Sequence, residues 1–90
     1  MKKTIITVVG KDSVGIIAKV CTYLANNRVN ILDISQTIVQ GFFNMMMIVD
    51  TTDADKNFDE INRELEQIGD EINCVIKVQR EEIFNKMHRI

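Results

Sequence analysis

The residues best suited to chemistry lie in one short segment, Gly10 to Ile16 (GKDSVGI). It follows the apolar run Ile5–Val9 and opens a stretch with the apolar periodicity of a helix. The first N–H groups of a helix have no intrahelical acceptor, and the helix dipole is positive there. A loop in this position therefore aims backbone N–H groups at one point, where a carboxylate or a phosphate can bind.

The same loop also has a purely structural interpretation. Gly10 and Gly15 can let the chain turn, and Asp12 or Ser13 can cap the helix that follows. The loop by itself leaves both interpretations open.

The hydrophobic pattern along the chain predicts four strands and two main helices. The predicted strands are Lys3–Val9, Val29–Val39, Phe42–Val49 and an alternating run of Ile72, Cys74, Ile76 and Val78. The first helix starts at Asp12 or Ser13 and closes at 26–28, and the second runs from about Phe58 to Ile68. Between the third strand and the second helix lies an acidic, polar loop, Asp50–Asn57. A short amphipathic helix is expected over about 81–90.

Side-chain periodicity predicts which faces are buried. In the first helix the predicted core stripe is Val14, Ile17, Ala18, Cys21, Leu24 and Ala25. In the third strand it is Phe43, Met45, Met47 and Val49. The opposite parity of that strand is only partly polar, so the second face of the sheet is also expected to be covered.

Three positions carry turn signals. Asn27 is expected to take the left-handed conformation at the end of the first helix. Gln40-Gly41 predicts a tight hairpin turn, although glutamine disfavours a positive φ. Gly69 is expected to stop the second helix as its C′ residue.

The order of elements is β-α-β-β-α-β, followed by the short helix. Right-handed crossovers place both main helices on one face of a four-stranded antiparallel sheet. The prediction is an α+β, ferredoxin-like fold that forms one domain over residues 1–90, with its core in 2–80.

Composition limits the function classes. The net charge of −2 argues against electrostatic binding of nucleic acid, and no apolar run reaches the roughly 18 residues of a membrane span. One histidine and two scattered cysteines cannot form a zinc site. Cys21 and Cys74 both follow apolar parities and are expected to be buried thiols. We expect a cytoplasmic protein without a metal or cofactor.

Two motifs together resemble the ACT domain family. One is the Gly10–Ile16 loop, similar to the family's G-x-D-x-x-G-I pattern, and the other is Val29–Ile34 (VNILDI), similar to its V-N-I-x-x-I strand opening. The resemblance covers residues 2 to 80, and the chain looks most like the small single-ACT proteins related to the glycine-cleavage regulators. It differs from many relatives at Ser13-Val14, where they have Arg-Pro, so one cationic contact is missing.

The resemblance implies a regulatory amino-acid site at a homodimer interface, not a catalytic one. The implied ligand-binding residues are Gly10, Asp12, Ser13, Val14 and Gly15 in one chain, with Asn30 and Ile31 in the second strand of its partner. Loop N–H groups suit a carboxylate, Asp12 suits an ammonium group, and the Asn30 amide is both donor and acceptor. The regulated partner is then an enzyme or a transcription factor.

Two other functions compatible with this fold need residues that this chain lacks. An acylphosphatase needs an arginine in the first loop, where this chain has only Lys11. An RNA-binding domain of this fold stacks bases on aromatics of the central strands, and the first and fourth strands have none. A structural interaction module without a ligand stays open as the alternative.

Overall fold

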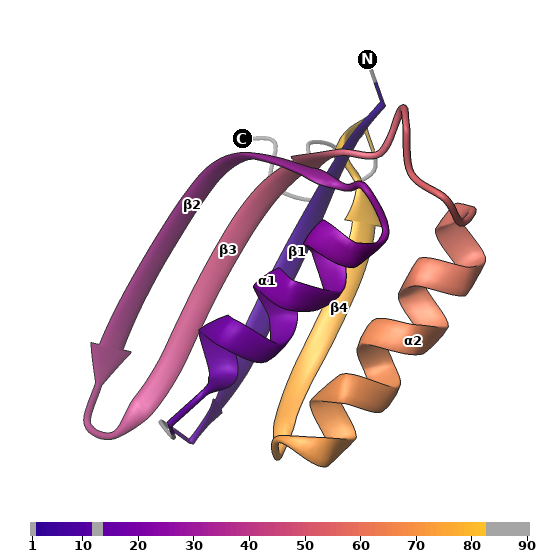
Figure 1. Ribbon diagram of the computed structural model, residues 1–90. Helices are drawn as coiled ribbons and strands as arrows, with labels where there is room; N and C mark the ends of the chain where they lie inside the picture. The colour runs from indigo at the N-terminus through magenta and orange to yellow at the C-terminus, as the bar shows by residue number, and fades with distance from the viewer. Residues whose placement is uncertain (1, 12–13, 83–90) are drawn as a thin grey trace.

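The chain folds into one antiparallel sheet with two helices. The computed structural model describes residues 2–11 and 14–82. Its elements are β1 (Lys3–Lys11), α1 (Ile16–Asn26), β2 (Asn30–Val39), β3 (Phe42–Asp50), α2 (Phe58–Glu71) and β4 (Cys74–Arg80). The strand order is β2-β3-β1-β4, and each neighbouring pair is antiparallel. Both helices lie on the same face of the sheet (Figure 1), which confirms the ferredoxin-like fold.

The core lies between the sheet and the helices, on the side-chain parities that the sequence predicts. Alternation along a strand sends every second side chain to the same face. The buried strand residues include Phe43, Met45, Met47 and Val49 in β3 and Cys74, Ile76 and Val78 in β4. From α2, Ile61 and Leu65 are buried, and Phe58 and Ile68 pack at the margin of the core.

The predicted core stripe of α1 is wrong except at Leu24. The helix begins at Ile16, and its buried residues are Ile16, Val20 and Leu24. Val14 is fully exposed, and Ile17 is 38% exposed. Helix α1 is apolar over two adjacent stripes, so periodicity alone could not choose between them. Cys21 lies on the other stripe and is only half-buried, whereas Cys74 is buried as expected.

The helix ends also differ from the prediction. Asn27 has φ −106°, and the left-handed residue after α1 is Arg28, with φ +57°. Helix α2 passes through Gly69 and ends at Glu71, and the left-handed residue that follows is Asn73, with φ +59°. A Cβ on Gly69 would lie 2.7 Å from the Cys74 carbonyl oxygen, so this glycine lets α2 approach β4. The Gln40-Gly41 turn is confirmed, because both residues have positive φ.

The face of the sheet away from the helices remains open in the described part of the chain. Val9, Phe42, Met46 and Val75 are exposed on it. The sequence predicts that this face is also covered, but no described residue of the chain covers it. The predicted C-terminal helix lies outside the described residues, apart from Glu81 and Glu82.

Candidate functional site

The glycine-containing loop lies between the end of β1 and the start of α1. Gly10 is still within β1, where a Cβ would lie 2.6 Å from Cys74 Sγ and 2.8 Å from the Asn73 carbonyl oxygen. The N-cap of α1 is Gly15, with φ +92°, a conformation that favours glycine. The helix therefore does not begin directly after Asp12 or Ser13, as predicted. These two residues lie outside the described residues.

Asn30 and Ile31 lie at the beginning of the edge strand β2. Asn30 pairs with Asp50 of β3, and Asp50 also pairs with Lys3 at the start of β1. Gly10, in contrast, pairs with Phe43 near the other end of β3. From Phe43 to Asp50 the strand rises about 23 Å, at about 3.3 Å per residue. Within one chain, Asn30 and the Gly10–Gly15 loop are thus at opposite ends of the sheet.

Strand β2 carries an apolar surface that the helices leave uncovered. Ile34 and Ile38 pair with the buried residues Met47 and Phe43 and so point to the helix side, yet they are 44% and 60% exposed. In Figure 1 α1 lies in front of β3 and β1, α2 lies beside β4, and β2 forms the far edge. In the described part of the chain β2 pairs on one side only, with β3.

One flank of α1 extends this uncovered surface. Lys19 and Tyr23 contact Glu71 and Glu64, so their side of the helix faces α2. Because successive residues are about 100° apart around a helix, the opposite flank carries Ile17 and Cys21. We call Ile17, Cys21, Ile34 and Ile38 together the β2-edge surface. Sequence reasoning assigned Ile17 and Cys21 to the core, and the second apolar stripe of α1 was the available signal for a different role.

A β-bulge interrupts the start of β2. The register with β3 shifts between Ile31 and Asp33, and Asp33 Oδ1 accepts a hydrogen bond from the Ile34 N–H at 2.8 Å. Bulges limit indiscriminate pairing at sheet edges. The regular part of this edge therefore begins at about Ile34.

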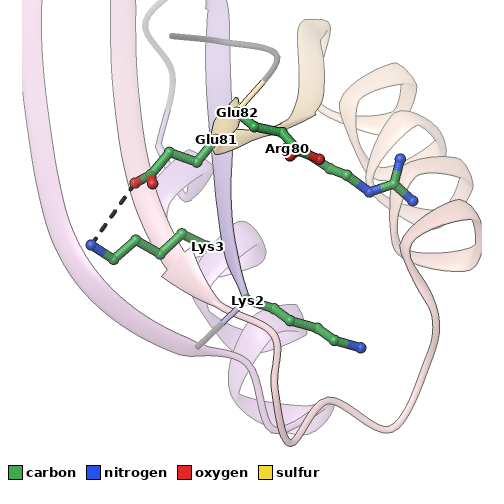
Figure 2. A pocket seen from close by; sticks show the side chains of 5 residues that line it. All are labelled: Lys2, Lys3, Arg80, Glu81 and Glu82. Atoms are coloured by element: carbon green, nitrogen blue, oxygen red, sulfur yellow. Dashed lines mark ion pairs between the residues drawn. The ribbon is translucent and has the colours of Figure 1, made fainter.

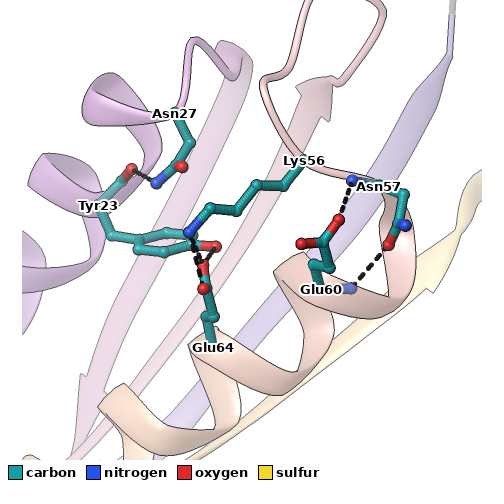
Figure 3. Close-up of polar contacts among 6 residues, drawn as sticks. All are labelled: Tyr23, Asn27, Lys56, Asn57, Glu60 and Glu64. Atoms are coloured by element: carbon teal, nitrogen blue, oxygen red, sulfur yellow. Dashed lines mark hydrogen bonds and ion pairs between the residues drawn. The ribbon is translucent and has the colours of Figure 1, made fainter.

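A polar cluster on the opposite side of α1 fastens the helices together (Figure 3). Tyr23 Oη donates a 2.6 Å hydrogen bond to Glu64, and Lys56 Nζ lies 2.7 Å from both oxygens of the same carboxylate. The Lys56 and Tyr23 contacts lower the pKa of Glu64, and burial together with the Glu64 carboxylate raises the pKa of Tyr23. The cluster joins α1, α2 and the loop between β3 and α2.

The start of α2 is fixed by reciprocal capping, also drawn in Figure 3. Asn57 Oδ1 accepts from the Glu60 N–H at 2.9 Å, and Glu60 Oε1 accepts from the Asn57 N–H at 3.3 Å. This capping box satisfies two N–H groups that the helix leaves unpaired. It explains why α2 begins at Phe58, as the sequence predicts.

Comparison with known proteins agrees with this fold. The ACT domain family profile matches residues 2–79. A UPF0237 protein of Bifidobacterium longum is 64% identical over 90 residues, covering 100% of both chains. The solved ACT domain protein from Streptococcus pneumoniae is 42% identical, with a TM-score of 0.81 over 92% of this chain and 93% of that one.

A more distant solved structure shares the fold alone. It is a putative glycine cleavage system transcriptional repressor, 21% identical, with a TM-score of 0.76 over 88% of this chain and 45% of its own. The family match and the close relatives show that the chain belongs to the ACT domain family, whose members are small regulatory ligand-binding modules. None of the helices in the described residues is long and apolar enough to span a membrane.

Proposed function

We propose that this ACT domain is a homodimeric regulatory module that binds an amino acid between its two chains and acts on a partner protein. The observation that carries the proposal is the separation of Asn30 from the Gly10–Gly15 loop. These two motifs cannot share a ligand within one protomer, whereas two protomers related by a twofold axis can bring them together.

The β2-edge surface supports that assembly. Antiparallel pairing of β2 with its copy would place the Asn30 end of one strand level with the Val39 end of the other. The Val39 end is the end of the sheet where the Gly10–Gly15 loop lies. The same pairing would satisfy the free backbone groups of the edge and cover Ile34 and Ile38.

This pairing would leave a notch between the Gly10–Gly15 loop of one protomer and Asn30 of the other, which we call the amino-acid notch. The groups on either side of it suit a zwitterion. The first N–H groups of α1, beside Gly15, have no acceptor within the helix and favour a carboxylate. Asn30 is exposed and contributes an amide that can donate and accept. Asp12 remains the predicted contact for the ammonium group, a charge-assisted hydrogen bond. Ser13, Val14 and Ile31 complete the proposed site.

Complementation between two variants tests the site directly. Asp12→Ala and Asn30→Ala should each remove the stabilisation that an amino acid gives in a thermal-shift screen. That stabilisation is about 2.7 kcal/mol at one hundred times the dissociation constant. Mixing the two variants after unfolding and refolding should restore about a quarter of the sites, because each heterodimer has one intact notch.

The outcomes separate the proposal from its alternatives. Ile34→Lys should give a monomer by sedimentation and lose the response, whereas the exposed helix variant Gln67→Ala should retain both dimer and response. A wild-type protein that sediments as a monomer at all concentrations contradicts the proposal. A dimer that responds to no amino acid at millimolar concentration supports a structural interaction module instead.

A further inference from the structure

A hollow lies at one end of the sheet, beside the start of α2. Its volume is about 620 Å³, and it lies among the start of β1, the loop before α2 and the end of β4. Cavities of roughly 300–1,000 Å³ are typical of small-molecule sites. The residues that line it include Lys2, Thr51, Thr52, Asn57, Phe58 and Arg80.

Two cations at this hollow have no carboxylate partner among the described residues. Lys3 pairs with Glu81 at 3.9 Å and Lys56 pairs with Glu64 at 2.7 Å. Asp55, the carboxylate in the lining, is paired with Arg28 at 2.8 Å. Lys2 Nζ and the Arg80 guanidinium are left, and Figure 2 shows both extending to the same side while Lys3 turns toward Glu81.

The Arg80 side chain and the Lys2 backbone are held by their surroundings. The Arg80 guanidinium carbon lies 4.3 Å from the centre of the Phe58 ring, a cation–π contact that limits its freedom. The backbone of Lys2 is fixed to the loop, since its N–H donates to Thr52 Oγ1 at 3.0 Å and its carbonyl accepts from the Thr51 N–H at 2.9 Å. Arginine presents a planar fork that matches phosphate oxygens, and lysine adds a mobile positive charge.

We propose that this hollow binds a small organic phosphomonoester, with its phosphate between Lys2 Nζ and the Arg80 guanidinium. Lys2 and Arg80 together carry the charge opposite to that of a phosphate dianion, and the Glu82 carboxylate lines the adjoining hollow with them. The remaining volume next to Thr51 and Thr52 has room for the organic part. The site shares no residue with the proposed amino-acid notch. It gives the module a second kind of ligand.

An amide-resolved NMR titration of the full chain tests the proposal. The probes are glycerol 3-phosphate, inorganic phosphate and sodium chloride at matched ionic strength. Saturable shifts should cluster at Lys2, residues 51–58 and Arg80 with glycerol 3-phosphate, and inorganic phosphate should shift the same residues more weakly. Lys2→Gln and Arg80→Gln should each weaken binding at least tenfold, whereas Lys77→Gln on the exposed face of β4 should leave it unchanged.

Three results would overturn the proposal. The first is that sodium chloride alone produces the same chemical shift changes. The second is that Lys2→Gln and Arg80→Gln both bind the ester as tightly as wild type. The third is that inorganic phosphate binds as tightly as the ester. Arg80→Lys retains the charge but loses the fork, so it should bind more weakly than wild type while remaining folded. The dimer and the amino-acid response should persist in Lys2→Gln and Arg80→Gln, so failure here is distinguishable from failure of the amino-acid notch.

Discussion

The two edges of the sheet differ in how their helix-facing side chains are covered. At β4, Ile76 and Val78 are buried beneath α2, which approaches closely because Gly69 has no side chain. At β2, Ile34 and Ile38 have the same chemistry and the same orientation but stay largely exposed. The difference arises because α2 is displaced toward β4 and α1 covers only the central strands (Figure 1).

The contrast shows that an apolar strand face does not have to be part of its own protomer's core. The β4 side is reinforced by the contacts of Tyr23 and Lys56 with Glu64 and by the capped start of α2. Strand β2 has one half-buried residue, Ile31, and no such support in the described residues. Stability should therefore depend on the β4 side, and association should depend on the β2 side.

The largest expected effect separates these two roles. Leu65 is fully buried, so Leu65→Ala should lower the free energy of unfolding by about 2–5 kcal/mol at every protein concentration. Ile38→Thr, at an exposed position, should change the stability of the isolated protomer by less than about 1 kcal/mol but weaken self-association. Urea denaturation at several protein concentrations measures both the stability of the protomer and its self-association. Equal losses in the two variants would remove the distinction between the edges.

A smaller effect tests the close approach of α2 to β4. Alanine normally stabilises a helix interior relative to glycine by about 0.5–1 kcal/mol. At Gly69 the new Cβ would meet the Cys74 carbonyl oxygen at 2.7 Å, so Gly69→Ala should instead destabilise the protein by about 1–3 kcal/mol. The exposed neighbour Gln67→Ala is the matched control and should be neutral. A stabilised Gly69→Ala protein would show that the helix and the strand are not in this contact.

The smallest effect concerns acid stability of the Glu64 cluster. Because the folded-state pKa of Glu64 lies below its ordinary value of 4.5, its contribution is present above that pH. The contribution is lost as the pH falls through the folded-state pKa. Between neutral and strongly acidic pH, wild type should thus lose more stability than Glu64→Gln. Tyr23→Phe should reduce the difference only partly, because Lys56 has the larger influence on the Glu64 carboxyl. If the free energy of unfolding of wild type and of Glu64→Gln changed with pH in the same way, the stabilising role of the Glu64 carboxylate would be contradicted.

The candidate site was only partly predictable. Gly15 was singled out in the sequence, and its positive φ at the start of α1 explains why glycine is there. Gly10 was also singled out, and it lies in β1 against Cys74, a contact between residues far apart in the chain. Lys2 and Arg80 gave no local signal, because they come from opposite ends of the described chain and line one hollow only through the pairing of β1 with β4.

By itself, the sequence determined the order of elements and the buried parity of β3 and β4, because strand and helix periods are local properties of consecutive residues. Those local patterns were sufficient to predict the ferredoxin-like fold. Only the tertiary structure decided which of two apolar stripes of α1 is buried, that Gly69 continues α2, and which sheet edge is left open. Each of these depends on how closely a helix packs against distant strands, and no local period contains that distance.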